Sequence, residues 1–79
     1  MDEIKKFLRN IDAKLREQLR RAIQAIMENR LKGLDIMPLQ GRKNVFRCRV
    51  RNVRIIFMRM GGSNVLCGIG FRGSVYRHR

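Results

Sequence analysis

The sequence predicts an α+β domain in which an N-terminal two-helix hairpin packs on an antiparallel sheet of about three strands. Up to about residue 32 the apolar residues recur every three or four positions, as they do in an amphipathic helix. From residue 44 onward they recur every second position, as they do in a half-buried strand. The length of 79 residues is typical of one domain, so we expect residues 1–79 to fold as a unit.

Two antiparallel helices are expected, over about residues 2–9 and 13–31. Asp12 is a good N-cap for the second helix, and Asn10 tolerates the left-handed conformation that ends the first. Gly33 is the expected stop of the second helix. A single rod would leave half of its apolar stripe uncovered by so small a sheet. The residues of the stripe are Ile4, Phe7, Leu8, Ile11, Leu15, Leu19, Ala22, Ile23, Ile26 and Met27.

Three strands are expected to follow as a meander, over Val45–Arg51, Arg54–Met60 and Val65–Arg72. Asn52 and Val53 form the first turn, and Gly61-Gly62-Ser63-Asn64 is a strong hairpin signal.

Alternation along these strands assigns their side chains to two faces of the sheet. The face expected beneath the helices carries Phe46, Cys48, Val50, Ile55, Phe57, Val65, Cys67, Ile69 and Phe71. The open face carries Arg47, Arg49, Arg54 and Arg72, around a hollow kept free of side chains by Gly68 and Gly70. Both cysteines are therefore expected to be buried free thiols.

Charge is distributed unevenly along the chain, whose net charge is +13. Residues 1–35 hold nine basic and six acidic groups, whereas residues 36–79 hold ten basic groups and no acid to neutralise them. Nine of those ten are arginines, which offer phosphate two parallel donors. The C-terminal part is therefore expected to bind nucleic acid, with Arg42, Lys43, Arg51 and Arg77 as RNA contacts around the open face.

A cluster of arginines also suits phosphodiester chemistry, because it stabilises the negative charge that builds on a phosphate under attack. The alternative is that these arginines are solvated surface residues. Tyr76 either stacks near a base or exchanges a proton with a ribose or phosphate oxygen, or it packs the C-terminal end of the sheet. His78 is the only histidine, but it is next to the last residue.

Several classes of protein are excluded by composition. The longest apolar run is too short to span a bilayer, and the charged N-terminus does not resemble a signal peptide. Cys48 and Cys67 fit no zinc or haem spacing, so no metal, cofactor or membrane partner is expected. A cytoplasmic location with reduced thiols is the simplest expectation.

Four short motifs resemble those of the RelE/ParE toxins of type II toxin–antitoxin systems. In chain order they are Pro38-Leu39-Gln40-Gly41, Phe46-Arg47-Cys48-Arg49-Val50, Val53-Arg54-Ile55-Ile56-Phe57 and Gly70-Phe71-Arg72-Gly73-Ser74-Val75-Tyr76-Arg77. They resemble the family's Pro-Leu-Lys-Gly turn, two of its strands and its C-terminal Gly-His-Arg-Arg-x-Val-Tyr-Arg. The resemblance extends over about residues 4–77.

The resemblance implies a ribosome-dependent messenger RNA endonuclease that needs no metal. A ribose 2′-hydroxyl attacks the adjacent phosphate and leaves a cyclic phosphate. The implied partners are an acidic antitoxin protein and messenger RNA on the ribosome, with contacts to ribosomal RNA. The implied catalytic residues are Arg47, Arg49, Arg54, Arg72 and Tyr76.

Three departures from the family keep other functions open. Arg47 and Arg49 stand where the nucleases often have lysines, and arginine is a poor base. Phe71 replaces a histidine or lysine. The family's first strand, before the helices, is missing, so we expect either an upstream start or a trimmed member. The alternatives are a ParE-like, non-enzymatic inhibitor of DNA gyrase and a basic nucleic-acid-binding module or inactive remnant.

Overall fold

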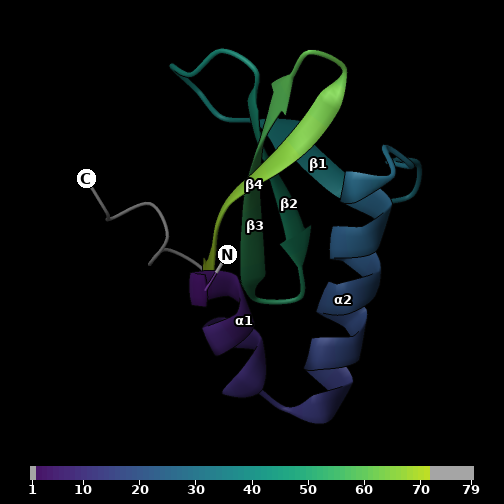
Figure 1. The fold of residues 1–79 in the computed structure, drawn as a ribbon, viewed down its shortest axis with the longest axis vertical. Helices are drawn as coiled ribbons and strands as arrows, with labels where there is room; N and C mark the ends of the chain where they lie inside the picture. The colour runs from purple at the N-terminus through teal and green to yellow at the C-terminus, as the bar shows by residue number, and fades with distance from the viewer. Residues whose placement is uncertain (1, 72–79) are drawn as a thin grey trace.

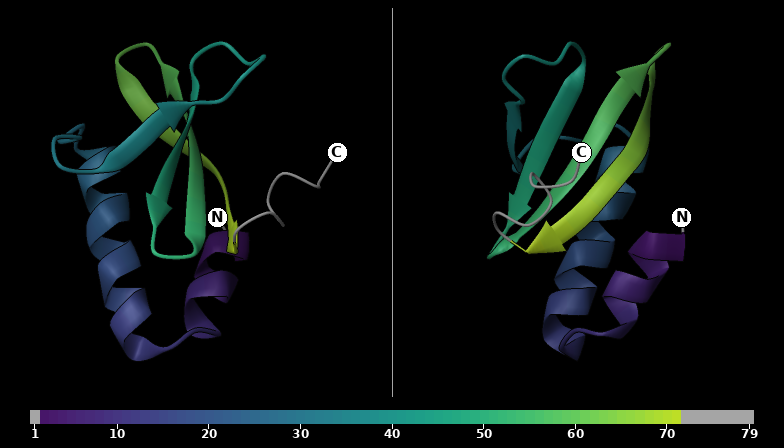
Figure 2. Two further views of the ribbon diagram at one scale, coloured as in Figure 1. Left: turned by 180° about the vertical axis from the view of Figure 1, so that it is seen from behind. Right: turned by 90° about the vertical axis from the view of Figure 1, so that its left-hand side faces the viewer.

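The computed structural model describes residues 2–71 as two helices on one face of an antiparallel sheet (Figure 1). The helices are α1 (Asp2–Arg9) and α2 (Ala13–Met27), and the strands are β1 (Asp35–Pro38), β2 (Val45–Val50), β3 (Val53–Met60) and β4 (Ser63–Phe71). The strands lie side by side in chain order, β1-β2-β3-β4. Figure 2 shows both helices on the same side of this sheet. The predicted helical hairpin and meander are confirmed.

The turn between the helices is held by side chains from both of its ends. Asp12 caps α2, because its Oδ2 accepts a hydrogen bond from the backbone N–H of Leu15 at 3.0 Å. Arg16 reaches back, and its guanidinium donates to the carbonyl of Leu8 at 2.7 Å and to that of Ile11 at 3.1 Å. The break predicted at residues 10–12 is therefore a turn stabilised by side-chain hydrogen bonds, which hold α1 beside α2.

Helix α2 ends at Met27, four residues earlier than predicted. The residue that turns the chain is Asn29, with a left-handed φ of 56°, and not Gly33. The N–H of Asn29 donates to the carbonyl of Ile26, and the N–H of Arg30 donates to that of Ala25. This pair of bonds is a Schellman motif, in which asparagine occupies the position that glycine usually takes.

The sheet has four strands where about three were predicted, because β1 pairs antiparallel with β2. Strand β1 is only four residues long, which is too short for an alternation of apolar and polar residues to be recognised in the sequence. Pro38 also argues against a strand, because proline has no backbone N–H. An edge strand tolerates it at a position whose N–H would make no hydrogen bond to the neighbouring strand.

A β-bulge at Cys67 changes the faces of β4. Ile56 pairs with Gly68, but Phe57 pairs with Leu66, so Cys67 is an extra residue in β4. Along β4 up to the bulge, each side chain therefore points to the opposite face of the sheet from the one predicted. Leu66 packs against the core, whereas Val65 and Cys67 are exposed. The prediction that Val65 and Cys67 lie beneath the helices was wrong for this reason.

The β3–β4 hairpin turns on Gly61 and Gly62 alone. Both glycines have positive φ, at 55° and 85°, as a type I′ turn requires. Strand β4 therefore begins at Ser63, which pairs with Met60, two residues earlier than predicted. The first hairpin also has a two-residue turn, but it is shifted by one residue from the prediction, because Val50 pairs with Val53 and the turn is Arg51 and Asn52.

A small core lies between the helices and the sheet. Its buried members are Leu19, Ala22, Ile26, Cys48, Val53, Ile55 and Phe57. The rings of Phe46 and Phe57 stack across β2 and β3 with centroids 5.5 Å apart. These residues come from the predicted stripe and strands, except Val53, which was predicted to lie in a turn.

The bulge also places one polar side chain inside the molecule. Asn64 is 3% exposed, and its Nδ2 donates to the carbonyl of Ile26 at 2.8 Å. Its Oδ1 accepts from Nη1 of Arg59 at 2.9 Å, and the same nitrogen donates to Oδ1 of Asn29 at 2.9 Å. These hydrogen bonds join the end of α2 to the β3–β4 hairpin.

The bulge predicts that the two cysteines react very differently with alkylating reagents. Burial, and to a lesser degree the Asp35 carboxylate, raises the pKa of Cys48 from an ordinary value of 9.0 to about 11. Cys67 is exposed. In pulsed iodoacetamide labelling at pH 8, read by mass spectrometry, Cys67 is expected to react within minutes and Cys48 only after urea unfolding. Equal rates for the two thiols in the folded chain would contradict the bulge.

The raised pKa of Cys48 also predicts a loss of stability at high pH. Below about pH 9 the thiol is neutral in both the folded and the unfolded chain, so it favours neither. As the pH rises toward 11, the unfolded chain loses this proton first and becomes more favourable. Thermal unfolding measured against pH should therefore show a smaller loss of stability at alkaline pH for Cys48→Ser than for the parent chain.

Candidate nucleic-acid interface

Strands β2 and β3 bring three of the predicted arginines to the face turned away from the helices. Arg49 pairs directly with Arg54 across the two strands, and Arg47 pairs with Ile56. Their neighbours along the strands, Cys48 and Ile55, are buried in the core on the opposite side. We call Arg47, Arg49 and Arg54 the arginine face.

The two glycines predicted for this face also have the expected register. Gly70 pairs with Arg54, and Gly68 pairs with Ile56. They therefore lie next to the arginine face on β4. The hollow expected above them stays a prediction.

Asp35 partly neutralises the arginine face. It pairs with Arg49 in register, and its Oδ2 lies 3.1 Å from Nε of Arg49. Its Oδ1 lies 3.5 Å from Nη1 of Arg47. The expectation that no acid serves these arginines was wrong, because Asp35 directly precedes the acid-free stretch and β1 folds it back onto β2. Like charges placed opposite one another destabilise a sheet, and Asp35 offsets part of that cost for Arg49 and Arg54.

Asp35 is a residue of the site that sequence reasoning missed. The signal available was weak: an aspartate directly before the short apolar run Ile36-Met37. Nothing in that pattern indicates which strand the run pairs with, and the pairing is what places the carboxylate.

The arginines of the face differ in how accessible they are. The side chain of Arg47 is 13% exposed, and its Nη2 lies 3.0 Å from the Met37 sulfur. The side chain of Arg49 is 45% exposed. Arg49 is therefore the readier hydrogen-bond donor to a phosphate, while Arg47 contributes a charge that solvent screens less.

Beyond Arg47 the same face becomes apolar. Val45 pairs with Met58, and Met58 pairs with Val65. Val45 and Ile56 are buried, although they do not belong to the core beneath the helices. The open face therefore has a basic end and an apolar end.

The other predicted RNA contacts lie at opposite ends of the sheet. Arg42 and Lys43 are exposed in the loop before β2, and Arg51 is exposed in the turn after it. At roughly 3.3 Å per residue, the strand between them holds them about 20 Å apart. Arg42 and Lys43 thus lie at one end of the arginine face, and Arg51 lies at the other. Arg72, Tyr76, Arg77 and His78 lie outside the described residues.

Two further observations concern residues 2–71 only. No group of three or more His, Cys, Asp or Glu side chains lies close enough together to hold a metal ion. Neither helix has the length and apolar character needed to cross a bilayer.

Comparison with known proteins gives one informative likeness. No protein-family model matches the chain, and no curated protein matches it. Among solved structures, a chain in the crystal structure of the RelB–RelE antitoxin–toxin complex from Methanococcus jannaschii is similar, with a TM-score of 0.74 and 25% sequence identity. The match covers 90% of this chain and 86% of that one. The chain therefore has a RelE-like toxin fold.

Proposed function

We propose that this chain is the toxin of a type II toxin–antitoxin pair and that it cleaves messenger RNA on the ribosome. The observation that carries the proposal is the arginine face: three arginines on the sheet surface opposite the helices, in a RelE-like fold. A cationic surface of this kind suits a phosphodiester backbone, and the fold suits an acidic antitoxin partner.

The proposed reaction is an internal transfer within the RNA. The ribose 2′-hydroxyl gives its proton to a base and attacks the adjacent phosphorus, the bond to the 5′-oxygen of the next nucleotide breaks, and that oxygen takes up a proton from water. The products are a 2′,3′-cyclic phosphate and a 5′-hydroxyl end. Arg49 and Arg54 stabilise the added negative charge on the phosphate oxygens, and Arg72 joins them. The family resemblance assigns Tyr76 to the reacting nucleotide.

The proton acceptor in this proposal is Asp35. Arginine stays protonated, so Arg47 and Arg49 cannot remove the 2′-proton. The Asp35 carboxylate reaches the same face and contacts both of them. In this proposal Arg49 thus positions the acceptor next to the phosphate that it binds.

Replacing Asp35 with asparagine is expected to separate RNA binding from cleavage. Loss of one negative charge frees Arg49 for one more phosphate, so the salt dependence of binding to single-stranded RNA should steepen by about 0.7 in log K against log salt. Cleavage should slow by about 10²-fold, as for loss of a general base. Fluorescence anisotropy with an oligonucleotide and primer extension on ribosome-bound messenger RNA measure the two effects. Slower cleavage with weaker binding would contradict this role.

The experiment that tests the function as a whole is induced expression in growing cells with mapping of messenger RNA 5′ ends. We expect growth arrest, and new 5′ ends within translated regions. Co-expression of a small acidic protein encoded beside this chain should restore growth.

A second candidate function is ParE-like inhibition of DNA gyrase. It is favoured by Arg47 and Arg49, which replace the lysines typical of the nucleases. Inhibition of gyrase supercoiling by the purified chain, together with unchanged messenger RNA ends in cells, would select this function. A basic binding module or inactive remnant would give neither toxicity nor cleavage, but RNA affinity that falls steeply with salt.

A further inference from the structure

The apolar end of the open face carries exposed methionines. Residues 2–71 include five exposed large apolar side chains, and three of them, Met37, Met60 and Val65, lie on this face at 52%, 55% and 40% exposure. Met58 lies among them, because it pairs with Val65 on β4 and shares its face of β3 with Met60. We call Met37, Met58, Met60 and Val65 the apolar patch. A protein in water seldom gathers exposed apolar side chains on one face unless that face binds a partner or ligand.

The apolar patch adjoins the arginine face along the same strands. Arg47 pairs with Met37 on β1, and its Nη2 lies 3.0 Å from the Met37 sulfur. On β3, Met58 lies on the same face as Arg54 and four residues further along, which is about 13 Å at the usual rise per residue. A nucleotide carries its charge on the phosphate and its apolar surface on the base. The open face presents cations and apolar surface side by side, within reach of neighbouring nucleotides of one strand.

The charge of the chain favours nucleic acid over a second copy of itself on this face. Each copy carries +13, so two copies repel one another. In the described part of the open face the only acidic residue is Asp35, which contacts Arg47 and Arg49 at the basic end. An RNA strand is drawn to that end through its phosphates, and its bases then lie beside the apolar patch.

Methionine stands here where single-strand-binding proteins usually have aromatic residues. The phenylalanines of residues 2–71 lie on the helix side of the sheet, where Phe46 and Phe57 pack at the core and Phe7 contacts Phe71. A methionine side chain is flexible and polarisable, and its sulfur makes favourable contacts with aromatic rings. Methionine and valine side chains have no strong hydrogen-bond donor or acceptor. A site of this composition holds a base by contact with its ring.

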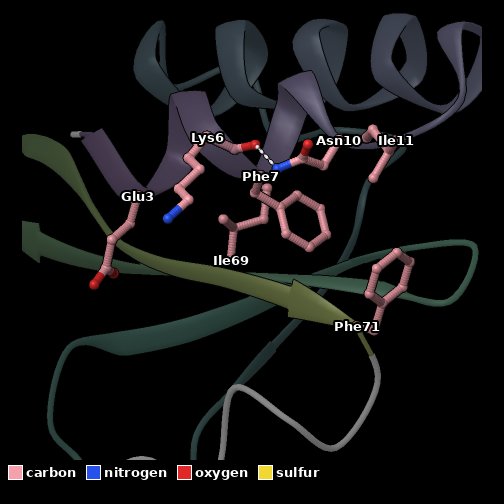
Figure 3. Close-up of a pocket in the computed structure, with 7 residues that line it drawn as sticks. All are labelled: Glu3, Lys6, Phe7, Asn10, Ile11, Ile69 and Phe71. Carbon is pink, nitrogen blue, oxygen red and sulfur yellow. Dashed lines mark hydrogen bonds between the residues drawn. The ribbon is translucent and has the colours of Figure 1, made fainter.

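A cavity in residues 2–71 lies on the other side of the sheet. It has a volume of about 330 Å³ and opens between α1 and β4 (Figure 3). Its apolar lining comes from Phe7, Ile11, Ile69 and Phe71, with the rings of Phe7 and Phe71 5.1 Å apart. Because this lining faces the helices, the cavity is separate from the apolar patch, and RNA on the open face leaves it free.

We propose that the apolar patch binds an RNA base beside the phosphate that the arginine face holds, by contact between the base ring and Met58 and its neighbours. This inference rests on the proposed function, in which RNA is the substrate of the same face. The arginines hold the strand by its charge, and the patch fixes how far the strand advances across the sheet. Base contact and phosphate contact use different residues, so mutation separates them.

The test couples one change in the protein to one change in the RNA. The probe is a short 2′-O-methyl oligoadenylate, which lacks the attacking hydroxyl, and in matched probes one nucleotide at a time is abasic. We expect the parent chain to bind at least one abasic probe about fivefold more weakly than the intact strand, as for loss of a sulfur–ring contact. Met58→Ala should bind the intact strand about fivefold more weakly and should no longer distinguish it from that abasic probe. Fluorescence anisotropy measures each affinity.

Matched variants separate ring contact from charge and from folding. Met27→Ala removes the same atoms from an exposed methionine at the end of α2 and should bind every probe as the parent chain does. Met58→Leu keeps an apolar side chain of similar size and should recover most of the affinity for the intact strand. Met58→Ala changes no charge, so its plot of log K against log salt should keep the parent slope. Arg49→Ala should flatten that slope by about 0.7.

Three outcomes would overturn this inference. The first is equal binding of the intact and all abasic probes by the parent chain. The second is a loss in Met58→Ala that is the same for intact and abasic probes. The third is equal RNA affinity of Met58→Ala and Met27→Ala; if Met58→Ala then binds the small acidic protein encoded beside this chain more weakly, the patch is a protein-docking surface instead.

Cleavage of ribosome-bound messenger RNA by the parent chain is measured in parallel. Its absence counts against the nuclease function alone, because the uncleavable probes report on the base site without any reaction. Cleavage together with one of the three outcomes above counts against the base site alone.

Discussion

Replacing Arg54 with alanine is expected to slow messenger RNA cleavage by about 10²–10³-fold, the usual cost of removing one preorganised donor to a developing negative charge. Arg54 lies opposite Arg49 on β2 and Gly70 on β4. Its guanidinium offers donors to two oxygens of the same phosphate. The effect should appear in the rate at saturating RNA, because the charge it stabilises exists mainly in the transition state.

Two further variants make this prediction specific. Arg54→Lys keeps the charge but loses the paired donors, so we expect an intermediate rate. Arg21→Ala removes an exposed arginine of α2 on the other side of the molecule and should cut at nearly the parent rate. Primer extension on ribosome-bound messenger RNA gives all three rates. If Arg54→Ala and Arg21→Ala cut equally fast, the arginine face is not the active surface.

The same assay extends to the residues identified through the family resemblance. Arg72→Ala and Tyr76→Phe should each abolish cleavage while leaving antitoxin binding nearly intact. If both variants cut at the parent rate, Arg72 and Tyr76 take no part in cleavage, and gyrase inhibition is favoured instead.

Replacing Asn64 with alanine is expected to destabilise the fold by about 2–3 kcal/mol, the cost of leaving buried hydrogen-bonding groups without their partner. The amide of Asn64 joins the carbonyl of Ile26 to the guanidinium of Arg59. For a domain of this size such a loss lowers the melting temperature by roughly 10–20 °C. Calorimetry or circular dichroism of the purified chain measures the shift.

Matched variants separate the hydrogen bonds from the hairpin itself. Asn64→Asp keeps an acceptor for Arg59 but loses the donor to Ile26, so it should fall between the parent and Asn64→Ala. Ser63→Ala changes the exposed neighbour and should shift the melting temperature little. A melting temperature for Asn64→Ala close to that of Ser63→Ala would show that the network does not hold α2 to the hairpin.

Much of the fold could be predicted because it follows from local patterns. A period of three to four residues identified both helices, and Asp12 marked where the second begins. A period of two identified β2 and β3, and Gly61-Gly62 marked the hairpin between β3 and β4. Each of these signals lies within about a dozen consecutive residues. They needed no information about which segments meet.

The features that could not be predicted depend on contacts between distant segments. Strand β1 exists because it pairs with β2, and that pairing brings Asp35 to Arg47 and Arg49. The bulge at Cys67 moves Asn64 inward, toward Ile26 of α2. A rule of strict alternation cannot foresee one extra residue, and a single such residue exchanges the two faces of a strand.

The sequence by itself determined the helical hairpin, the meander, the strong positive charge and the shared face of Arg47, Arg49 and Arg54, because each follows from periodicity or composition. Only the tertiary structure decided the fourth strand, the acid beside those arginines, the exposure of Cys67 and the cavity beside α1. Those features are set by strand register and packing, which join residues that lie far apart along the chain.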